Sequence, residues 1–228
     1  MPRSARPLEL TAELIVAAFP KWPADDHAAM PLLDDTALAP LIDQAFAPVV
    51  DGEPVWVFGY GALLWKPDFP FSEQRHALLR GWHRRFCLWQ WRFRGTRETP
   101  SLMLGLDRGG ACHGLAFRIE PPAVRAKLEP MVSRELRGDG YRPRWFALET
   151  DEGPLTALGF VINHASPRYA GRLPDDVVAS YIASACGHLG PSADYLRETA
   201  ARCQALGIED RMLMRVQALV AQKLCPPR

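Results

Sequence analysis

The sequence lacks several features that mark common classes of protein. None of its five cysteines is spaced as Cys-x-x-Cys, and their number is odd, so neither a zinc site nor a disulfide framework is expected. No apolar stretch reaches the length needed to span a bilayer. Glu9 and Glu13 interrupt the apolar residues after Arg3 and Arg6, which argues against a signal peptide. We therefore expect a cytoplasmic protein with reduced thiols and no membrane partner.

Strong charge of one sign and several catalytic motifs are also absent. A formal net charge of +1 gives no reason to expect nucleic acid or an anionic membrane as a partner. The six histidines form neither a His-Glu-x-x-His motif nor a cluster with acidic residues at the spacing of metal ligands. The sequence contains no Gly-x-Ser-x-Gly elbow, P-loop or dinucleotide-binding glycine pattern. We expect neither a metal nor a cofactor.

The chain is expected to form one domain preceded by an extension. With 228 residues, of which 48% are hydrophobic, it is long enough for one sizeable core. Residues 1–54 are rich in proline and alanine and are expected to form an N-terminal extension that packs against the domain 55–228. Within the extension, the apolar periodicity predicts helices over 11–18, with Thr11 as N-cap, and over 35–47.

The rest of the chain is rich in strands first and helical afterwards. Strands are expected at 55–60, 82–92, 101–106, 112–119, 143–149 and 155–162. A helix is expected over 121–136, with Pro121-Pro122 in its first turn and Gly138 at its exit. Further helices are expected at 175–186, 192–206 with Ser192 as N-cap, and 210–224. This order predicts an α+β fold with a small barrel or a strongly curved sheet.

The most informative segment is Val-Trp-Val-Phe-Gly-Tyr-Gly-Ala-Leu-Leu-Trp at residues 55–65. An apolar run typical of a buried strand stops there at Gly59-Tyr60-Gly61. Glycines allow a sharp turn and let backbone N–H groups come close to a ligand. The segment is therefore a candidate binding loop, although many Gly-x-Gly loops only turn a corner.

Glu135 is the candidate catalytic group. Four residues are spaced to share one helical face: Val124, Leu128, Met131 and Glu135. The three apolar members direct that face inward, and burial raises the pKa of a carboxyl group, as a general base or acid near neutral pH requires. The alternative interpretations are a salt bridge with Arg134 or Arg137, an exposed helix end, and a helix broken at Pro130.

Arginines and tryptophans are interleaved between residues 75 and 97. Such a mixture can bind single-stranded nucleic acid through stacking and phosphate contacts. Alternate residues also form one largely apolar face, made of Arg85, Cys87, Trp89, Trp91 and Phe93. Because the net charge is close to zero, we favour a half-buried strand over a nucleic-acid site.

These segments together resemble the ChaC-type γ-glutamylcyclotransferases, from about Val55 to the C-terminus. Five elements occur in the order of that family: the loop segment 55–65, Leu-Arg-Gly-Trp-His-Arg-Arg-Phe-Cys-Leu at 79–88, Arg-Gly-Thr followed by Pro100, Arg134-Glu135-Leu136 followed by Gly140-Tyr141, and Gly-Pro-Ser-Ala-Asp-Tyr-Leu at 190–196. No single element is decisive, but five in order over this span are specific.

The resemblance implies a γ-glutamylcyclotransferase-like fold, a small mixed β-barrel with flanking helices. It also implies cleavage of glutathione to 5-oxoproline and Cys-Gly without cofactor or metal, with Glu135 as the proton acceptor. The implied γ-glutamyl pocket is formed by Gly59, Tyr60, Gly61, Ala62, Leu63 and Leu64. Two tyrosines are further candidates for its lining: Tyr141 and Tyr195.

Ala62 departs from the family pattern, which has serine in its Tyr-Gly-Ser-Leu loop. The hydroxyl group is missing here, while the backbone N–H remains. Two alternative functions stay open: cyclotransfer on other γ-glutamyl compounds, and a regulatory module that binds γ-glutamyl groups without turnover. The oligomeric state is open as well.

Overall fold

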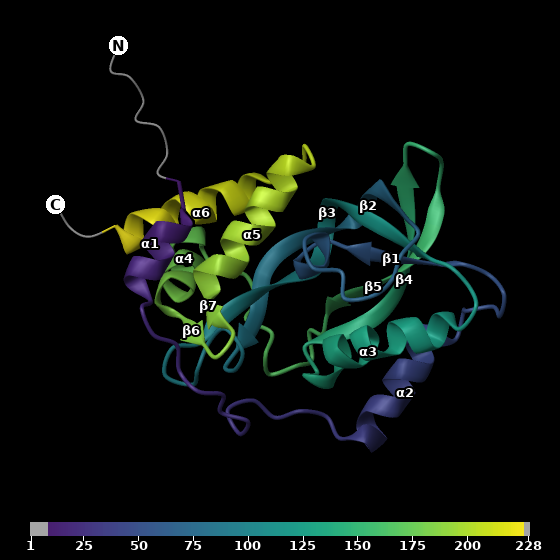
Figure 1. The fold of residues 1–228 in the computed structure, drawn as a ribbon, viewed down its shortest axis with the longest axis horizontal. Coiled ribbons are helices and arrows are strands. Elements are labelled where there is room, and N and C mark those ends of the chain that lie inside the picture. The colour runs from purple at the N-terminus through teal and green to yellow at the C-terminus, as the bar shows by residue number, and fades with distance from the viewer. Residues whose placement is uncertain (1–8, 226–228) are drawn as a thin grey trace, which may run out of the picture. The chain divides into compact units, whose positions relative to one another are not determined.

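The structure, a computed structural model, describes residues 9–225 (Figure 1). Arg3 and Arg6 lie outside this range. The described chain divides into two compact units. The barrel unit comprises Met30–Leu88 and Met103–Gly171, and the helical unit comprises the described residues up to Ala29, Trp89–Leu102 and those from Arg172 onward. A boundary at residue 54 between an extension and a domain stays a prediction.

The elements follow one another in the predicted order. The helices are α1 (Ala12–Ala18), α2 (Asp35–Phe46), the short 3₁₀ helix η1 (Ala62–Leu64), α3 (Val124–Arg137), α4 (Asp175–Ser184), α5 (Ser192–Ala205) and α6 (Arg211–Leu224). The strands are β1 (Val55–Gly59), β2 (Glu73–Gln90), β3 (Ser101–Ile119), β4 (Tyr141–Thr150), β5 (Leu155–Ile162), β6 (Cys186–Gly187) and β7 (Gly190–Pro191).

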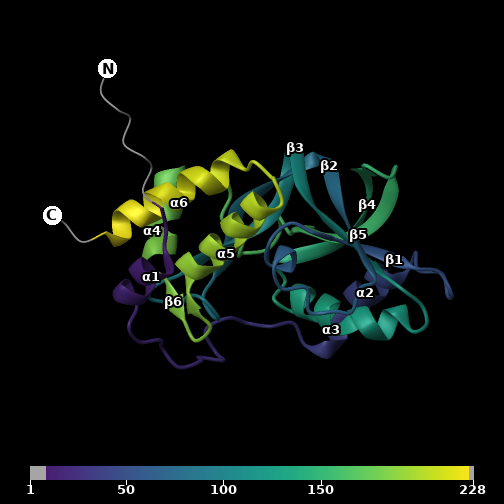
Figure 2. The same ribbon diagram turned by 45° about the horizontal axis from the view of Figure 1, so that its top comes forward.

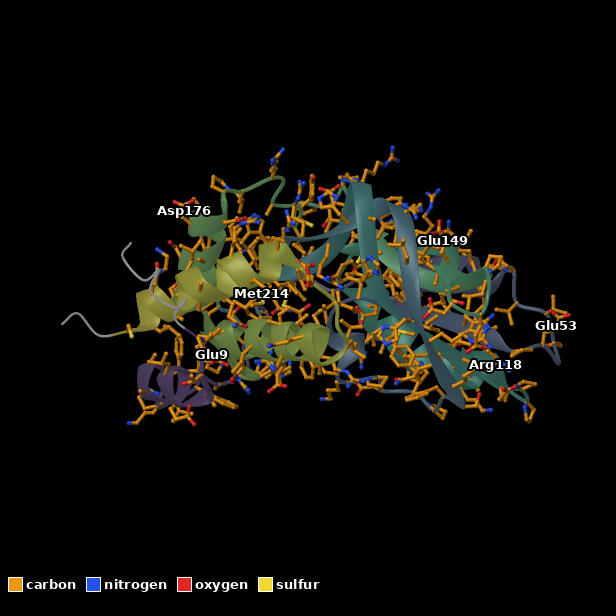
Figure 3. The ribbon with its side chains drawn as sticks, turned by 90° about the horizontal axis from the view of Figure 1, so that it is seen from above. Glu9, Glu53, Arg118, Glu149, Asp176 and Met214 are labelled. Atoms are coloured by element: carbon orange, nitrogen blue, oxygen red, sulfur yellow. The ribbon has the colours of Figure 1, made fainter. Side chains whose placement is uncertain are left out.

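Five strands of the sheet close into a barrel in the order β1-β3-β2-β4-β5. β1 runs antiparallel to β3, with Val57 opposite Phe117, and parallel to β5, with Val57 opposite Leu158. All three side chains are buried in the core. Arg118 of β3 and Glu149 of β4, labelled in Figure 3, keep part of their side chains exposed to solvent. The predicted α+β fold with a small mixed barrel is confirmed.

Two strands are longer than predicted. β2 begins at Glu73 rather than at residue 82, and the strands expected at 101–106 and 112–119 are a single strand, β3. Three glycines with positive φ lie inside these strands: Gly81, Gly109 and Gly110. Glycines of this kind bend a strand without ending it. The prediction was wrong because it treated them as breaks between strands.

α2 and α3 lie side by side in both ribbon views, and each contacts β4 (Figures 1 and 2). The carboxylate of Asp34 caps α2 by accepting a hydrogen bond of 2.8 Å from the Ala37 N–H. The indole Nε1 of Trp145, in β4, donates to the carbonyl of Ala45 at 3.0 Å. The helix predicted at 35–47 is confirmed, and it packs on the helix that carries Glu135.

α3 begins at Val124, so the prediction that Pro121-Pro122 forms its first turn is wrong. A proline disfavours the helical conformation in the residue before it, so Pro122 keeps Pro121 out of the helix; the bond between them is cis. Pro130 lies inside α3 and does not end it, and Gly138 follows the last helical residue as predicted.

In the helical unit, α4 and α5 each pack against α6, and α1 contacts both α5 and α6. Thr11 caps α1 as predicted, by accepting a hydrogen bond of 3.3 Å from Leu14 N–H. Ser192 is the first residue of α5 rather than its N-cap, and its hydroxyl pairs with that of Ser101 at 2.5 Å. Asp176 of α4 and Met214 of α6 are exposed (Figure 3).

Residues 9–225 lack two structural features. No helix in this range combines the length and the apolar character that crossing a membrane requires. The same residues contain no group of three or more histidine, cysteine, aspartate or glutamate side chains that could hold a metal ion. The cysteines are all free thiols.

Candidate functional site

The loop 59–64 starts where β1 ends, at a glycine that cannot be replaced without a clash. A Cβ atom on Gly59 would lie 2.9 Å from Phe117 Cε2 and 3.0 Å from Leu63 Cβ. Such close packing requires a residue without a side chain. The chain then makes the 3₁₀ turn η1, closed by a bond of 3.0 Å from Leu64 N–H to the Gly61 carbonyl.

The 3₁₀ turn presents consecutive backbone donors. Among residues 9–225, no acceptor is found for the N–H groups of Gly61, Ala62 and Leu63. The side chains of Leu63 and Leu64 are buried, and the Leu64 N–H already donates to Gly61, so Leu63 can offer a ligand its backbone N–H more readily than its side chain. Successive N–H groups in a turn form a concave site for an anion or a polarised oxygen.

A buried arginine, Arg84, binds the backbone of this loop. Tyr60 is only 8% exposed, and its hydroxyl donates to the carbonyl of Phe160 at 3.0 Å. The Tyr60 carbonyl in turn accepts a bond of 2.6 Å from Nε of Arg84, which is 5% exposed. Arg84 Nη2 also donates to the carbonyl of His113 at 2.7 Å. The Tyr60 side chain is therefore part of the scaffold that supports the loop.

Arg84 is a residue that sequence reasoning missed. It is one of the arginines interleaved with tryptophans at residues 75–97, and the interpretation of that stretch rests on the face with Arg85 and Cys87. The other face of β2 buries Arg84, Phe86 and Leu88. An arginine in register with two buried apolar residues was the signal that could have identified it.

Glu135 lies on the inward face of α3, as its spacing predicts. Val124, Leu128 and Met131, which share that face, are buried, while the Glu135 side chain keeps 24% of its surface exposed. This partial exposure leaves the carboxylate accessible from one side. The structure excludes two of the alternatives, a helix end exposed to solvent and a helix broken at Pro130. Glu135 lies at the boundary between the core and solvent.

The Glu135 carboxylate is only weakly paired. Arg134 Nη2 lies 3.3 Å from Oε1, while Nη1 of the same guanidinium binds Asp68 Oδ2 at 2.5 Å. Within the described residues, both hydrogen bonds from Arg134 to this carboxylate go to Oε1, and Oε2 accepts none. Burial raises the pKa of Glu135, Arg134 opposes the rise and Asp68 adds to it. The salt bridge with Arg134 thus exists, but it does not cancel the effect of burial.

The two candidate tyrosines lie in different units. Tyr141 begins β4 in the barrel unit, and its hydroxyl donates to the carbonyl of Leu104 at 2.6 Å. Tyr195 is buried in α5 of the helical unit. A role of either residue in lining a γ-glutamyl pocket stays a prediction.

The arginines interleaved with tryptophans are engaged in structural contacts. Arg75 lies over the Trp56 ring, 4.7 Å from its centroid, and pairs with Glu152 at 3.0 Å. Arg92 forms two hydrogen bonds to Asp25, of 2.8 and 2.7 Å. These contacts favour the half-buried strand over a nucleic-acid site.

Comparison with known proteins places this geometry in a family. Residues 55–223 match the ChaC-like protein family. The chain belongs to that family. The matched region begins at Val55, the first residue of β1, and includes the 59–64 loop and Glu135.

Several ChaC-like relatives have names that state an activity. The chain is 36% identical over 177 residues to the glutathione-specific gamma-glutamylcyclotransferase of Escherichia coli (strain K12), an alignment that covers 75% of this chain and 77% of the relative. It is 35% identical over 164 residues to glutathione-specific gamma-glutamylcyclotransferase 1 of Mus musculus, covering 69% and 74%. It is 30% identical over 166 residues to gamma-glutamylcyclotransferase 2-3 of Arabidopsis thaliana, covering 69% and 83%.

A solved structure shares the ChaC-like fold. The crystal structure of the gamma-glutamyl cyclotransferase specific to glutathione from yeast aligns with a TM-score of 0.66 at 18% sequence identity, covering 76% of this chain and 100% of that chain. Its selenomethionine-labelled form aligns with a TM-score of 0.69, covering 74% and 96%. At this identity the likeness establishes the fold of the barrel with its helices.

Proposed function

We propose that this protein is a glutathione-specific γ-glutamylcyclotransferase that converts glutathione to 5-oxoproline and Cys-Gly. The observation that carries the proposal is Glu135, a carboxylate on the inward face of α3 that is weakly paired and has a raised pKa. The similarity to relatives named for this activity supports the choice of substrate.

Glu135 takes and returns one proton in the proposed reaction. The substrate's α-amine is protonated near neutral pH and becomes nucleophilic only after it loses a proton. Ionised Glu135 accepts that proton, and its raised pKa makes it a stronger base than an ordinary carboxylate. The α-nitrogen then attacks the γ-carbonyl carbon and loses its second proton to water as the ring closes. The bond from this carbon to the cysteine nitrogen breaks as Glu135 returns the first proton to the leaving nitrogen, and the neutral amine of Cys-Gly takes up a further proton from solvent.

The 59–64 loop provides the second part of the chemistry. The γ-carbonyl oxygen gains negative charge when the ring closes, and the N–H groups of Gly61, Ala62 and Leu63 are donors suited to it. A pocket that holds the γ-glutamyl chain bent also brings amine and carbonyl together before reaction. Because the nucleophile belongs to the substrate, the reaction needs no metal, cofactor or nucleophilic side chain.

Ala62 bears on how the protein binds its substrate. In the proposed binding mode the backbone N–H of Ala62 contacts the substrate, so the serine hydroxyl of the family pattern is dispensable.

The cysteines bear on where the protein acts. All five are free thiols, which are typical of a reducing compartment, in which glutathione keeps cysteines reduced. We propose that the protein acts in the cytoplasm.

A panel of substrates tests this function. The purified protein is incubated with glutathione, γ-glutamylamines and γ-glutamyl amino acids, and 5-oxoproline is quantified. The proposal predicts turnover of glutathione and little turnover of the others. Faster release from another γ-glutamyl compound would contradict glutathione specificity, and glutathione binding without 5-oxoproline release would indicate a regulatory module.

A further inference from the structure

The C-terminal end of α3 leads into a tight turn, and a separate segment of the chain holds that turn. The turn comprises Gly138, Asp139 and Gly140, and it joins α3 to β4. Asp139 has a φ of 55°, in the left-handed region that side chains other than those of asparagine and aspartate rarely adopt. Glu135 lies in α3, one helical turn before Asp139. The path of residues 138–140 therefore sets the position of the Glu135 carboxylate.

The guanidinium of Arg168 is inserted against the turn. Arg168 is only 7% exposed, and its Nη1 donates to the Gly138 carbonyl at 2.7 Å. A Cβ atom on Gly140 would lie 3.1 Å from Nη1 and 2.6 Å from Leu88 Cδ1, and a Cβ on Gly138 would overlap the guanidinium. The two glycines therefore make the space that Arg168 fills.

Asn163 binds the same turn from the end of β5. Its backbone N–H donates to the carbonyl of Gly140 at 2.9 Å, and its Nδ2 donates to that of Asp139 at 3.0 Å. With Arg168, it supplies donors to the carbonyls of all three residues of the turn. Carbonyls beyond a helix end need partners when they are buried, and here they find them in one segment, residues 163–168.

This segment is itself anchored to the barrel strands. The buried carboxylate of Asp107, in β3, accepts hydrogen bonds from His164 Nε2 at 2.8 Å and from the Tyr169 hydroxyl at 3.1 Å. Ala170 N–H donates to the carbonyl of Cys87, in β2, at 2.8 Å. Although burial pushes the pKa of Asp107 upward, the hydrogen bonds led by that of His164 hold it below its ordinary value, so the anchor is ionised at neutral pH.

We infer that Arg168 and Asn163 are positioning residues that hold the end of α3 so that Glu135 faces the substrate. This inference rests on the proposed function of Glu135. Neither residue is required to touch substrate. Their role is to keep the carboxylate within the small tolerance that proton transfer demands, since a misplacement of about 1 Å can cost about 10²-fold in rate.

Substitution of Arg168 by methionine tests the inference. Arg168→Met keeps much of the side-chain volume and removes the donor to Gly138. We expect kcat for glutathione to fall about 10- to 100-fold, with KM nearly unchanged. Loosening the helix end lets water reach Glu135, so its pKa should fall and the acidic limb of the kcat–pH profile should move to lower pH. Arg134 and Asp68, the charged groups that act on Glu135 in the described residues, are unchanged in this variant.

A matched control separates positioning from a general loss of stability. Thr150 donates from Oγ1 to the Gly153 carbonyl at 2.6 Å, in the turn at the other end of β4. Thr150→Val removes a side-chain donor to a glycine carbonyl in a turn of the same unit, and it should leave kcat and the pH profile at wild-type values. Asn163→Ala, which keeps the backbone bond to Gly140, is the second test variant and carries the test if Arg168→Met does not fold.

The outcomes distinguish this inference from the proposed function. Wild-type kcat and pH profile in the folded test variants, beside an inactive Glu135→Gln, would overturn the positioning role alone. A rise in KM with unchanged kcat would also overturn it, because that result indicates substrate binding. Full activity of Glu135→Gln would instead remove the basis of the proposed reaction. A lowered kcat together with a shifted acidic limb would support the inference.

Discussion

The 59–64 loop and the end of α3 each receive a hydrogen bond from a buried arginine, yet they present different kinds of group. Arg84 binds the carbonyl of Tyr60 at 2.6 Å, and Arg168 binds that of Gly138 at 2.7 Å. The loop so held offers backbone N–H groups, whereas the helix end offers one side-chain carboxylate.

This difference determines how far each region tolerates substitution. A backbone donor is present whatever the side chain, so the proposed binding mode predicts that Ala62 can replace the serine of the family pattern. The carboxylate of Glu135 has no backbone equivalent. We therefore expect mutations of Glu135 to abolish chemistry and mutations of the loop to act mainly through its shape.

The largest effect is expected for Glu135→Gln. Loss of the proton acceptor should lower kcat about 10²- to 10⁴-fold, the usual contribution of a general base or acid. Steady-state release of 5-oxoproline measures this. A loss below about tenfold would place the base elsewhere and break the distinction between the two regions.

Although Glu135→Gln should lower activity, it should raise the stability of the folded protein at neutral pH. The folded-state pKa of Glu135 is raised, so the unfolded state loses its proton first as pH rises. Ionisation therefore costs folding free energy above the unfolded-state pKa, and stability falls as pH rises through the folded-state pKa. Glu135→Gln removes this cost. Its melting temperature should exceed that of the wild type at neutral pH and approach it below the unfolded-state pKa, as thermal unfolding across pH would show.

Arg84→Met is the corresponding change at the loop. It leaves the buried carbonyl of Tyr60 without this donor, at a cost of about 1–3 kcal/mol in the free energy of unfolding, and it also removes the donor to the more exposed carbonyl of His113. Because the loop is proposed to hold the γ-glutamyl group, KM for glutathione should rise together with a fall in kcat. Denaturant unfolding and initial rates measure the two effects, and a stable variant with unchanged KM would contradict the role of the loop.

Gly59→Ala tests the packing beneath the loop. The added Cβ meets Phe117 and Leu63 at distances that require the backbone to move, with a cost of about 1–3 kcal/mol. Activity should fall with stability. Gly153→Ala is a control with open space around the added Cβ, although its φ of +104° adds local backbone strain; it should retain kcat and KM. Equal activity of both variants would show that the shape of the loop is unimportant.

Ala62→Ser should have the smallest effect. A restored hydroxyl adds at most one hydrogen bond, worth about 0.5–1.5 kcal/mol, so kcat/KM should change by no more than about tenfold. A larger gain would show that the family serine holds substrate through its side chain and that backbone donors are insufficient.

Sequence patterns predicted the elements better than their ends and contacts. Apolar periodicity located α2 and the inward face of α3, and Glu135 followed from that face. Glycine was misread inside strands, as at Gly81, because the sequence does not show whether a positive φ bends a strand or ends it. Pairing between distant residues, such as Arg84 with Tyr60 or Arg168 with Gly138, depends on tertiary structure and left little trace in local spacing.

The central claim is ring closure by the substrate's own amine with Glu135 as base, and product analysis in ¹⁸O-labelled water tests it most directly. Wild-type protein should release unlabelled 5-oxoproline and an equal amount of Cys-Gly from glutathione, and folded Glu135→Gln should release neither at a comparable rate. Release of ¹⁸O-labelled glutamate, which indicates hydrolysis, or undiminished 5-oxoproline formation by Glu135→Gln would contradict the account.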